Sequence, residues 1–209
     1  QNKVNLVNKN QSPIEDEYVS NKLKNVKIAA TTNANDCIPK SDVVIVCVPT
    51  PVDKNNSPDL TALMESVSSV SKSIKEKTLL VIESTIYPGT TEEIVLPILK
   101  KQKFDAYRND IFVAHCPERI DPGNKKWTIE NLPRVVSGIT KEATKKAAEF
   151  YRSIISAEII ELSSVKAAEA TKIMENTFRD VNIAFVNEMA QSFDEAGIDI
   201  LEVIRGAST

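Results

Sequence analysis

The sequence predicts an α/β protein in which a parallel β-sheet is followed by one long helix. Three segments, residues 42–48, 78–82 and 111–114, are nearly continuous aliphatic runs. Such runs are typical of parallel strands buried on both faces of a sheet. Amphipathic helical patterns alternate with them, and this alternation favours a parallel sheet. The last element, residues 164–196, has a helical pattern with no internal Gly or Pro.

Helices separate the predicted strands, and local signals indicate where they begin. In the first helix, Leu63, Val67 and Val70 recur at spacings of four and three, as on a buried helix face. In the second, Thr90 and Glu93 have the spacing of a capping box, so we expect this helix to begin at Thr90. The predicted helices cover residues 60–74, 90–100 and 141–155. Shorter strand candidates cover residues 26–29, 134–137 and 158–162.

The predicted final helix is longer than a compact α/β unit usually contains. At ~1.5 Å per residue its length would be nearly 50 Å. Apolar residues such as Phe178, Phe185 and Phe193 recur along it. The pattern fits a packing helix, a connector between domains or the spine of a dimer.

The composition narrows the class of protein. A chain of 209 residues predicts one large domain, or one domain with an appendage. The net charge of -3 includes no basic block, so we expect neither nucleic acid nor a membrane surface as a partner. No apolar run reaches the ~18 residues of a membrane span, and residues 1–10 are polar, unlike a signal peptide. We therefore expect a cytoplasmic protein.

The cysteines and the histidine form no metal-binding or disulfide pattern. Cys37, Cys47 and Cys116 stand far apart and contain no Cys-x-x-Cys pair. Because His115 is the single histidine, we expect no metal site. Cys116 and His115 are interpreted as buried residues of the core.

Polar loops follow the three strongest strand patterns. In open α/β sheets, ligands bind beyond the carboxyl ends of the strands. We therefore expect Thr50, Thr85 and Glu118, one from each loop, to share one edge. Pro and Gly that merely punctuate turns are the better explanation for any single loop, whereas all three together favour a site. The loops are residues 49–51, 83–91 and 116–124, the last including Asp121-Pro122-Gly123-Asn124.

The long helix adds a polar stripe. Lys172, Asn176 and Arg179 are spaced by four and three residues, which places them on one helix face. A solvated face is the commoner meaning of such a stripe. The stripe therefore points to a site only in combination with the loops.

Taken together, four segments resemble the UDP-glucose/GDP-mannose dehydrogenase family and occur in the order that the family has. They are VPTP at residues 48–51, ESTIYPGTTEE at 83–93, CPERIDPGN at 116–124 and AEATKIMENTFRDVNIAFVNE at 168–188. The Pro-Glu-Arg and Pro-Gly-Asn pair resembles the UDP-N-acetylmannosamine dehydrogenase branch, since UDP-glucose enzymes usually carry Pro-Glu-Phe-Leu there.

The resemblance implies an incomplete Rossmann-like parallel sheet followed by a long central helix. Residues 1–163 would be the NAD-binding domain without its first β-α-β unit, and residues 164–209 the central helix and dimerisation segment. The five glycines are too dispersed for the G-x-G-x-x-G dinucleotide fingerprint, and the family's Gly-Gly-His-Cys nucleophile motif and UDP-binding domain are not in this sequence. We therefore expect this chain alone to be inactive.

The family oxidises a UDP-sugar alcohol to a carboxylate with NAD, through covalent intermediates on a cysteine other than Cys116. The resemblance implies catalytic roles for four residues, Lys172, Asn176, Glu118 and Thr85. It implies coenzyme contacts for Thr50 and Thr85, and substrate contacts for Arg119, Ile120, Lys172, Asn176 and Arg179. The expected substrate is UDP-N-acetylmannosamine and the expected assembly a homodimer. UDP-glucose 6-dehydrogenase and a non-catalytic dimerisation or nucleotide-sugar-binding remnant are the alternatives.

Overall fold

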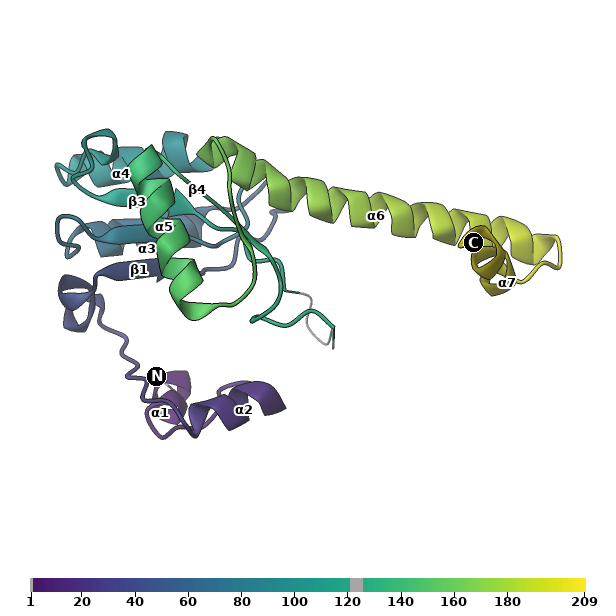
Figure 1. Ribbon diagram of the computed structural model, residues 1–209, viewed down its shortest axis with the longest axis horizontal. Coiled ribbons are helices and arrows are strands. Elements are labelled where there is room, and N and C mark those ends of the chain that lie inside the picture. Colours follow the sequence, from purple (N-terminus) through teal and green to yellow (C-terminus); the bar gives the residue numbers. More distant parts are fainter. Residues whose placement is uncertain (1, 121–125) are drawn as a thin grey trace.

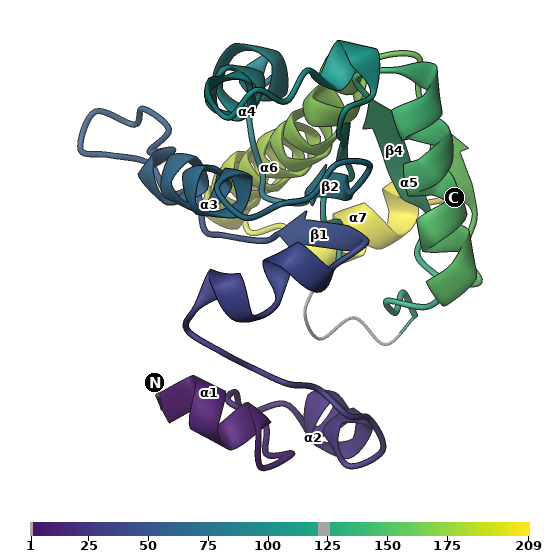
Figure 2. The ribbon, with the colours of Figure 1, turned by 90° about the vertical axis from the view of Figure 1, so that its left-hand side faces the viewer.

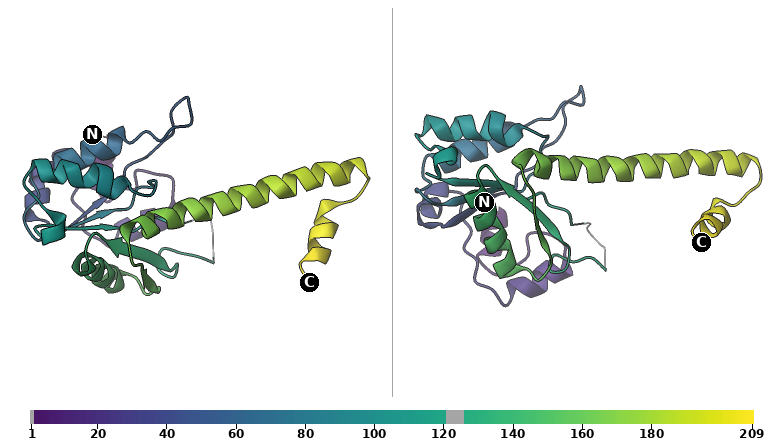
Figure 3. Two further views of the ribbon diagram at one scale, coloured as in Figure 1. Left: turned by 90° about the horizontal axis from the view of Figure 1, so that it is seen from above. Right: turned by 45° about the horizontal axis from the view of Figure 1, so that its top comes forward.

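The computed structural model describes residues 2–120 and 126–209, so the Asp121-Pro122-Gly123-Asn124 segment lies outside the described residues. Figure 1 shows a body of sheet and helices from which one long helix projects. A short final helix turns back near the far end of the long one, as Figure 3 shows from two further sides. The helices at the N-terminal end lie beside the body, away from the sheet (Figure 1).

The sheet has five strands in the order β1-β2-β3-β4-β5. They are β1 (Val43–Val46), β2 (Leu79–Ile82), β3 (Phe112–His115), β4 (Arg134–Gly138) and β5 (Ile159–Glu161). Strands β1, β2 and β3 are parallel, with Val44 beside Leu80 and Leu80 beside Val113. These five strands confirm the α/β class and the predicted strands at their positions.

Strand β4 departs from the expected parallel arrangement, because it is antiparallel to β3. Parallel neighbours need a long crossover, usually a helix, whereas antiparallel neighbours do not. The described part of the connection from β3 to β4 contains no helix, which fits the reversed direction. Strand β5 is again parallel to β4, and helix α5 provides the crossover between them.

The strand predicted at residues 26–29 is wrong. This segment has no regular structure, and Val26 and Ile28 are 41% and 50% exposed. The Asn8 side chain bonds the backbone of Ala30, with Asn8 Nδ2 donating to Ala30 O at 2.9 Å and Ala30 N donating to Asn8 Oδ1 at 2.7 Å. Only the residue that follows the segment, Ala30, is held, by a side chain 22 residues away, and residues 26–29 are not part of the described sheet.

Two apolar cores lie on opposite faces of the sheet. Leu80 and Ile82 point into the first core, with α3 and α4, whereas Leu79 and Val81 point into the second, with α5. This alternation follows from the two-residue period of a strand and explains why β2 and β3 consist of buried residues throughout. Figure 2 shows the resulting layers, with α3 and α4 on one side of the sheet and α5 on the other.

The predicted helices form close to the expected bounds. Helix α3 buries Leu63, Val67 and Val70, as their spacing predicted. In α5, the Thr140 hydroxyl caps the N-terminus by accepting from Ala143 N. The helices of the body and the N-terminal end are α1 (Asn2–Val7), α2 (Glu17–Leu23), α3 (Thr61–Ser71), α4 (Leu96–Lys101) and α5 (Lys141–Ile154). Single helical turns lie at η1 (Ala34–Asp36), η2 (Ile38–Lys40) and η4 (Ala106–Arg108).

The capping box expected at Thr90 is wrong. Thr90 already has helical dihedrals, and its hydroxyl donates to Tyr87 O at 2.7 Å. The chain then forms a π-helical segment, η3 (Thr91–Val95), that continues into α4. The cap is instead the carboxylate of Glu169, which accepts from Gly89 N at 2.6 Å and from Thr91 N at 2.8 Å. A carboxylate distant in the sequence thus takes the place of the expected local cap.

The long helix is confirmed as α6 (Val165–Glu195), 31 residues that begin at the N-cap Ser164. Its first turns pack against β3 and β4 and bury Val165, Ala168 and Glu169. Beyond Glu169, its described residues are partly or fully exposed. Helix α7 (Ile200–Ala207) follows. Among the described helices, none combines the length and apolar character that crossing a membrane requires.

We expect Glu169→Ala to lower the free energy of unfolding by roughly 3 kcal/mol, because it leaves two buried N–H groups without an acceptor. Urea unfolding measures this loss, and hydrogen exchange of the Gly89 and Thr91 amides locates it. Glu188→Ala is the matched control, since Glu188 is exposed on the same helix and surface changes stay within about 0.5 kcal/mol. Unchanged protection of both amides in Glu169→Ala would contradict the assignment.

Candidate active site

The loops after β1, β2 and β3 meet in one pocket at the carboxyl edge of these strands. Thr50, Thr85 and Glu118 all line it, so the structure brings together the three loop residues as expected. The other lining residues are Cys47, Val48, Pro49, Glu83 and Ser84. The pocket therefore combines hydroxyl, carboxylate and backbone groups from three separate parts of the chain.

Hydrogen bonds hold the first two loops against each other. Ser84 Oγ accepts from Val48 N at 2.9 Å and donates to Val48 O at 2.8 Å. Thr50 Oγ1 donates to Thr85 O at 2.6 Å. Because each hydroxyl bonds the backbone of the other loop, Thr50 and Thr85 have a fixed separation.

The Glu118 carboxylate is held from two sides. Its Oε1 accepts from the backbone N–H groups of Arg119 at 2.7 Å and Ile120 at 2.8 Å. Its Oε2 accepts from Arg134 Nη2 at 3.0 Å. The Glu118 side chain is still 41% exposed, whereas that of Arg134 is 8% exposed. Glu118 therefore keeps an open side while Arg134 lies behind it.

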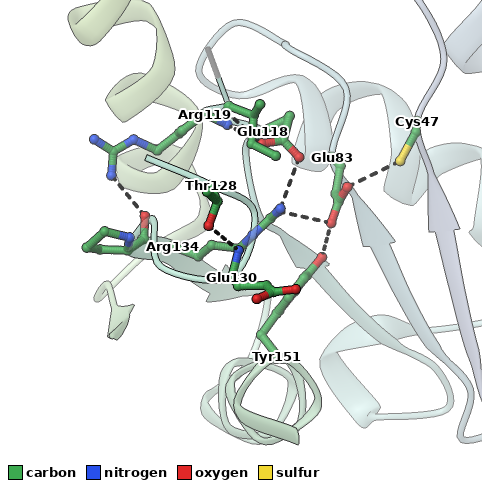
Figure 4. Close-up of polar contacts among 10 residues, drawn as sticks. Cys47, Glu83, Glu118, Arg119, Thr128, Glu130, Arg134 and Tyr151 are labelled. Carbon is green, nitrogen blue, oxygen red and sulfur yellow. Dashed lines mark hydrogen bonds and ion pairs between the residues drawn. The ribbon is translucent and has the colours of Figure 1, made fainter. Parts of the chain in front are cut away.

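Arg134 also pairs with a second carboxylate, as Figure 4 shows. Its Nη1 lies 3.5 Å from Glu83 Oε1. The Tyr151 hydroxyl donates to the same Glu83 oxygen, and Cys47 Sγ donates to Glu83 Oε2 at 3.3 Å. Burial by itself would lower the pKa of Arg134. The combined interactions with Glu118, Cys116 and Glu83 are larger than this effect, so the pKa of Arg134 is raised.

The thiols and the tyrosine of this region are held in their protonated forms. Although Cys47 is exposed at the surface, partial desolvation of its thiol, together with the nearby Glu83 charge, raises the pKa of Cys47 to about 12. Burial likewise raises the pKa of Cys116 to about 11 and also raises the pKa of Tyr151. Cys116 and His115 are both fully buried, as predicted for core residues.

Helix α6 reaches the third loop through Glu175. Arg119 Nε lies 2.8 Å from Glu175 Oε2, and Arg179 Nη2 lies 2.9 Å from Glu175 Oε1. Lys172 is half-buried, while Asn176 and Arg179 are exposed. The structure thus links Arg179 to the Glu118 loop through one residue, and a position of Lys172 and Asn176 facing Glu118 stays a prediction.

Sequence reasoning missed four residues of this region: Glu83, Arg134, Tyr151 and Glu175. The available signal for Arg134 was a charged residue opening a predicted buried strand, and for Glu175 its place within the polar stripe. Glu83 opens the polar loop at residues 83–91 and so carried the signal of that loop, whereas Tyr151 carried none. Across residues 2–120 and 126–209, no three His, Cys, Asp or Glu side chains gather in a way that could hold a metal ion.

We expect Cys47 to react slowly with iodoacetamide at pH 8, because the thiolate is the nucleophile and a pKa of about 12 leaves little of it. Glu83→Gln removes a charge that disfavours the thiolate, so Cys47 should react several-fold faster in that variant. Mass spectrometry of the Cys47 peptide measures the rate, and Cys37, which is also exposed, serves as internal reference. Equal Cys47 rates in both proteins would contradict the contact between Cys47 and Glu83.

Comparison with known proteins identifies two family domains. Residues 1–155 match the NAD binding domain of the UDP-glucose/GDP-mannose dehydrogenase family, and residues 166–209 match its central domain. The chain is 46% identical over 201 residues to Protein CapL of Staphylococcus aureus, which covers 96% of this chain and 47% of that protein. It is 42% identical over 183 residues to UDP-N-acetyl-D-glucosamine 6-dehydrogenase of Pseudomonas aeruginosa, and this match covers 88% of this chain and 43% of that protein.

A solved structure agrees with these matches. The UDP-D-ManNAc dehydrogenase of Pyrococcus horikoshii superposes with a TM-score of 0.92 at 33% identity, over 100% of this chain and 50% of that one. The chain thus spans about half the length of the relatives that it matches. Two consecutive domain matches and a shared fold lead to one conclusion: the chain belongs to the UDP-glucose/GDP-mannose dehydrogenase family.

Proposed function

We propose that this chain forms the coenzyme-binding and central-helix part of an NAD-dependent dehydrogenase that oxidises UDP-N-acetylmannosamine to UDP-N-acetylmannosaminuronate. The observation that carries the proposal is the pocket shared by Thr50, Thr85 and Glu118. The chain's place in the family supports the coenzyme and the reaction class. In the overall reaction, a primary alcohol and one water yield a carboxylate while two NAD⁺ are reduced to two NADH and three protons are released.

The proposed sugar carries an N-acetyl group. Two of the relatives are named for UDP-N-acetylhexosamines, one for the mannosamine and one for the glucosamine. In this chain Glu118 is followed by Arg119 and Ile120, where UDP-glucose enzymes usually have Phe-Leu. UDP-glucose is therefore the less favoured alternative.

The pocket fits one end of a dinucleotide. Its volume of about 410 Å³ is within the range of small-ligand sites, and it lies at the strand edge where α/β sheets bind nucleotides. Thr85 would contact the nicotinamide and Thr50 the ribose or phosphates of the coenzyme, since both line the pocket. NAD supplies the hydride acceptor when bound. The pyrophosphate-binding glycine turn is not among these residues, because the glycines are too dispersed.

Four side chains would act on the sugar. Glu118 would orient or deprotonate a water, because its carboxylate keeps an exposed side. The Lys172 ammonium would stabilise negative charge developing on the sugar oxygen, a contribution that is commonly large. Asn176, one turn further along α6, would hold that oxygen or an ordered water. Thr85 would assist the movement of the proton.

Substrate contacts are proposed for Arg119, Ile120 and Arg179, together with Lys172 and Asn176. The guanidinium groups of Arg119 and Arg179 both pair with Glu175, which leaves further N–H donors on each. Such planar donors suit the phosphate oxygens of a UDP-sugar. Arg179 is the more available of the two, with 52% of its side chain exposed against 25% for Arg119.

The test compares NAD reduction by residues 1–209 alone with NAD reduction by a full-length chimera. Residues 1–209 alone should not reduce NAD with UDP-N-acetylmannosamine, since none of Cys37, Cys47 and Cys116 lies in the family's nucleophile motif. A chimera that places this chain between the N-terminal unit and C-terminal domain of the Staphylococcus aureus relative should do so. In the chimera, Lys172→Ala should lower kcat by about 100-fold or more, as loss of a fixed charge-stabilising donor does.

Lys145→Ala is the matched control for that measurement, because Lys145 is an exposed lysine of α5. Absorbance of the reduced coenzyme follows the reaction. Sustained NAD reduction by residues 1–209 alone, abolished by Lys172→Ala, would refute the proposed inactivity of the isolated chain. Full activity of the Lys172→Ala chimera would refute the proposed role of the lysine.

We also propose that the chain forms a homodimer through α6. Beyond its anchored first turns the helix exposes large apolar side chains, with Phe178, Val181 and Phe185 each at least 59% exposed. An apolar patch of this extent is typical of an interaction surface. The same observation supports the second candidate function, a dimerisation module without catalysis. That candidate predicts dimers and no turnover in the chimera.

We expect light scattering at high micromolar concentration to give twice the 23.1 kDa mass of one chain. Phe185→Asp should shift the protein to monomers, because it places a charge within the apolar face. Ile14→Asp is the control, since Ile14 is 55% exposed but lies outside α6. A monomeric parent protein would contradict the proposed dimer.

A further inference from the structure

A buried ion-pair network lies directly behind the candidate pocket. Arg134 stands between the carboxylates of Glu118 and Glu83, and its side chain is only 8% exposed. Figure 4 shows the guanidinium between the two carboxylates, with Tyr151 below Glu83. Arg134, Glu83 and Tyr151 have no part in the proposed chemistry, so their arrangement needs a separate explanation.

The contacts of Glu118 show what Arg134 adds. The two N–H groups on Oε1 belong to Arg119 and Ile120, which are in the same loop as Glu118 itself. They fix the carboxylate relative to its loop only. Arg134 is the first residue of β4, so its bond to Oε2 connects the carboxylate to the sheet. Among the described contacts of the Glu118 carboxylate, the bond from Arg134 is the one that attaches it to a strand of the sheet.

Arg134 is itself held in place by its neighbours. Glu83 lies at the end of β2 and accepts from Tyr151 of α5, which is packed in the second core. The Tyr151 ring also lies 5.5 Å from the Arg134 guanidinium carbon. A buried cation is stable only when it is paired and hydrogen-bonded. The contacts thus form one continuous series, from Tyr151 to Glu83, from Glu83 to Arg134 and from Arg134 to Glu118.

We propose that Arg134 is a positioning residue for Glu118 and that Tyr151 and Glu83 support it. Arg134 holds Glu118 Oε2 toward the sheet and so directs the open side of the carboxylate into the pocket. The inference deepens the proposed function, because it rests on Glu118 acting in that pocket. Loss of a purely stabilising ion pair would weaken the whole fold. Loss of the Arg134–Glu118 ion pair should instead release the Glu118 side chain before it affects the rest of the fold.

The first test measures the Glu118 loop directly in residues 1–209. Hydrogen exchange followed by NMR reports the Arg119 and Ile120 amides, both bonded to Glu118. In Arg134→Gln these two amides should exchange at least tenfold faster, while the Val81 and Val113 amides of the sheet stay unchanged. Arg134→Lys keeps the charge without the planar fork, so it should restore part of the protection. Tyr151→Phe should show a smaller effect in the same two amides.

The matched control is Arg152→Gln, an exposed arginine of α5 paired with Glu161 at 2.8 Å. It removes an ion pair that is shorter than the 3.0 and 3.5 Å pairs of Arg134 but far less buried, and it should leave the Arg119 and Ile120 amides unchanged. Unchanged exchange of these amides in Arg134→Gln would overturn the proposal. Equally faster exchange throughout the sheet would also overturn it, because the role would then be general stability.

A second test in the chimera separates positioning from the proposed function. Arg134→Gln should lower kcat at least tenfold with little change in KM for NAD, and Arg134→Lys should recover part of kcat. Full turnover by the Glu118→Gln chimera would refute the proposed chemical role of Glu118. The amide exchange in residues 1–209 tests separately whether Arg134 holds the carboxylate. Failure of the proposed function and failure of the positioning role therefore give different results.

Discussion

The buried carboxylate of Glu169 is the contact on which the relation between the sheet and the long helix depends. It is fully buried, and each of its oxygens accepts one backbone N–H at the start of the η3–α4 helix. Helix N-termini present unpaired N–H groups and favour negative charge, so a carboxylate is well suited to this position. The backbone there also needs Gly89, whose φ is 99° and where a Cβ would lie 2.8 Å from Glu93 Oε1.

This contact sets where the rest of α6 lies. The first turns pack on β3 and β4, and an ion pair of Lys166 with Glu92 at 2.9 Å adds a second tie to the same helix start. Glu175 follows Glu169 by six residues, about 9 Å along the helix axis, and there it meets Arg119 of the third loop. The first turns of α6 are thus bound to the segment after β2 through Glu169, and the following turns are bound to the loop after β3 through Glu175. Helix α6 therefore holds its polar stripe in a fixed position relative to the pocket loops.

The parts of the fold that the sequence predicted are those that local pattern determines. Strands β2 and β3 are continuous aliphatic runs because both of their faces are buried, and α6 followed from an uninterrupted helical pattern. Strand β1 has the same kind of run, although it lies at the sheet edge and its Ile45 is 39% exposed. The failures came from distant partners. Thr90 has the spacing of a capping box, but the cap arrives from Glu169, 78 residues away from Thr91.

The same limit applies to the candidate site. Its loops could be predicted, because polar residues after buried strands mark the ligand edge of an α/β sheet. The network behind them could not, since Arg134 is 51 residues from Glu83, and Tyr151 is 68 residues from it. No local period relates such residues. Likewise the segment 26–29 has a strand-like pattern, but no neighbouring strand pairs with it among the described residues.

Two glutamates of this protein show how surroundings separate a structural carboxylate from one suited to chemistry. Both accept two backbone N–H groups, so hydrogen bonding alone does not distinguish Glu169 from Glu118. Glu169 receives one N–H group on each oxygen and is fully buried, so no ligand can reach its carboxylate. Glu118 receives both on one oxygen and Arg134 on the other, and 41% of its side chain stays exposed. A carboxylate offers about four acceptor positions, so these three bonds leave Glu118 one further position, and its side chain lines the pocket together with Thr50 and Thr85.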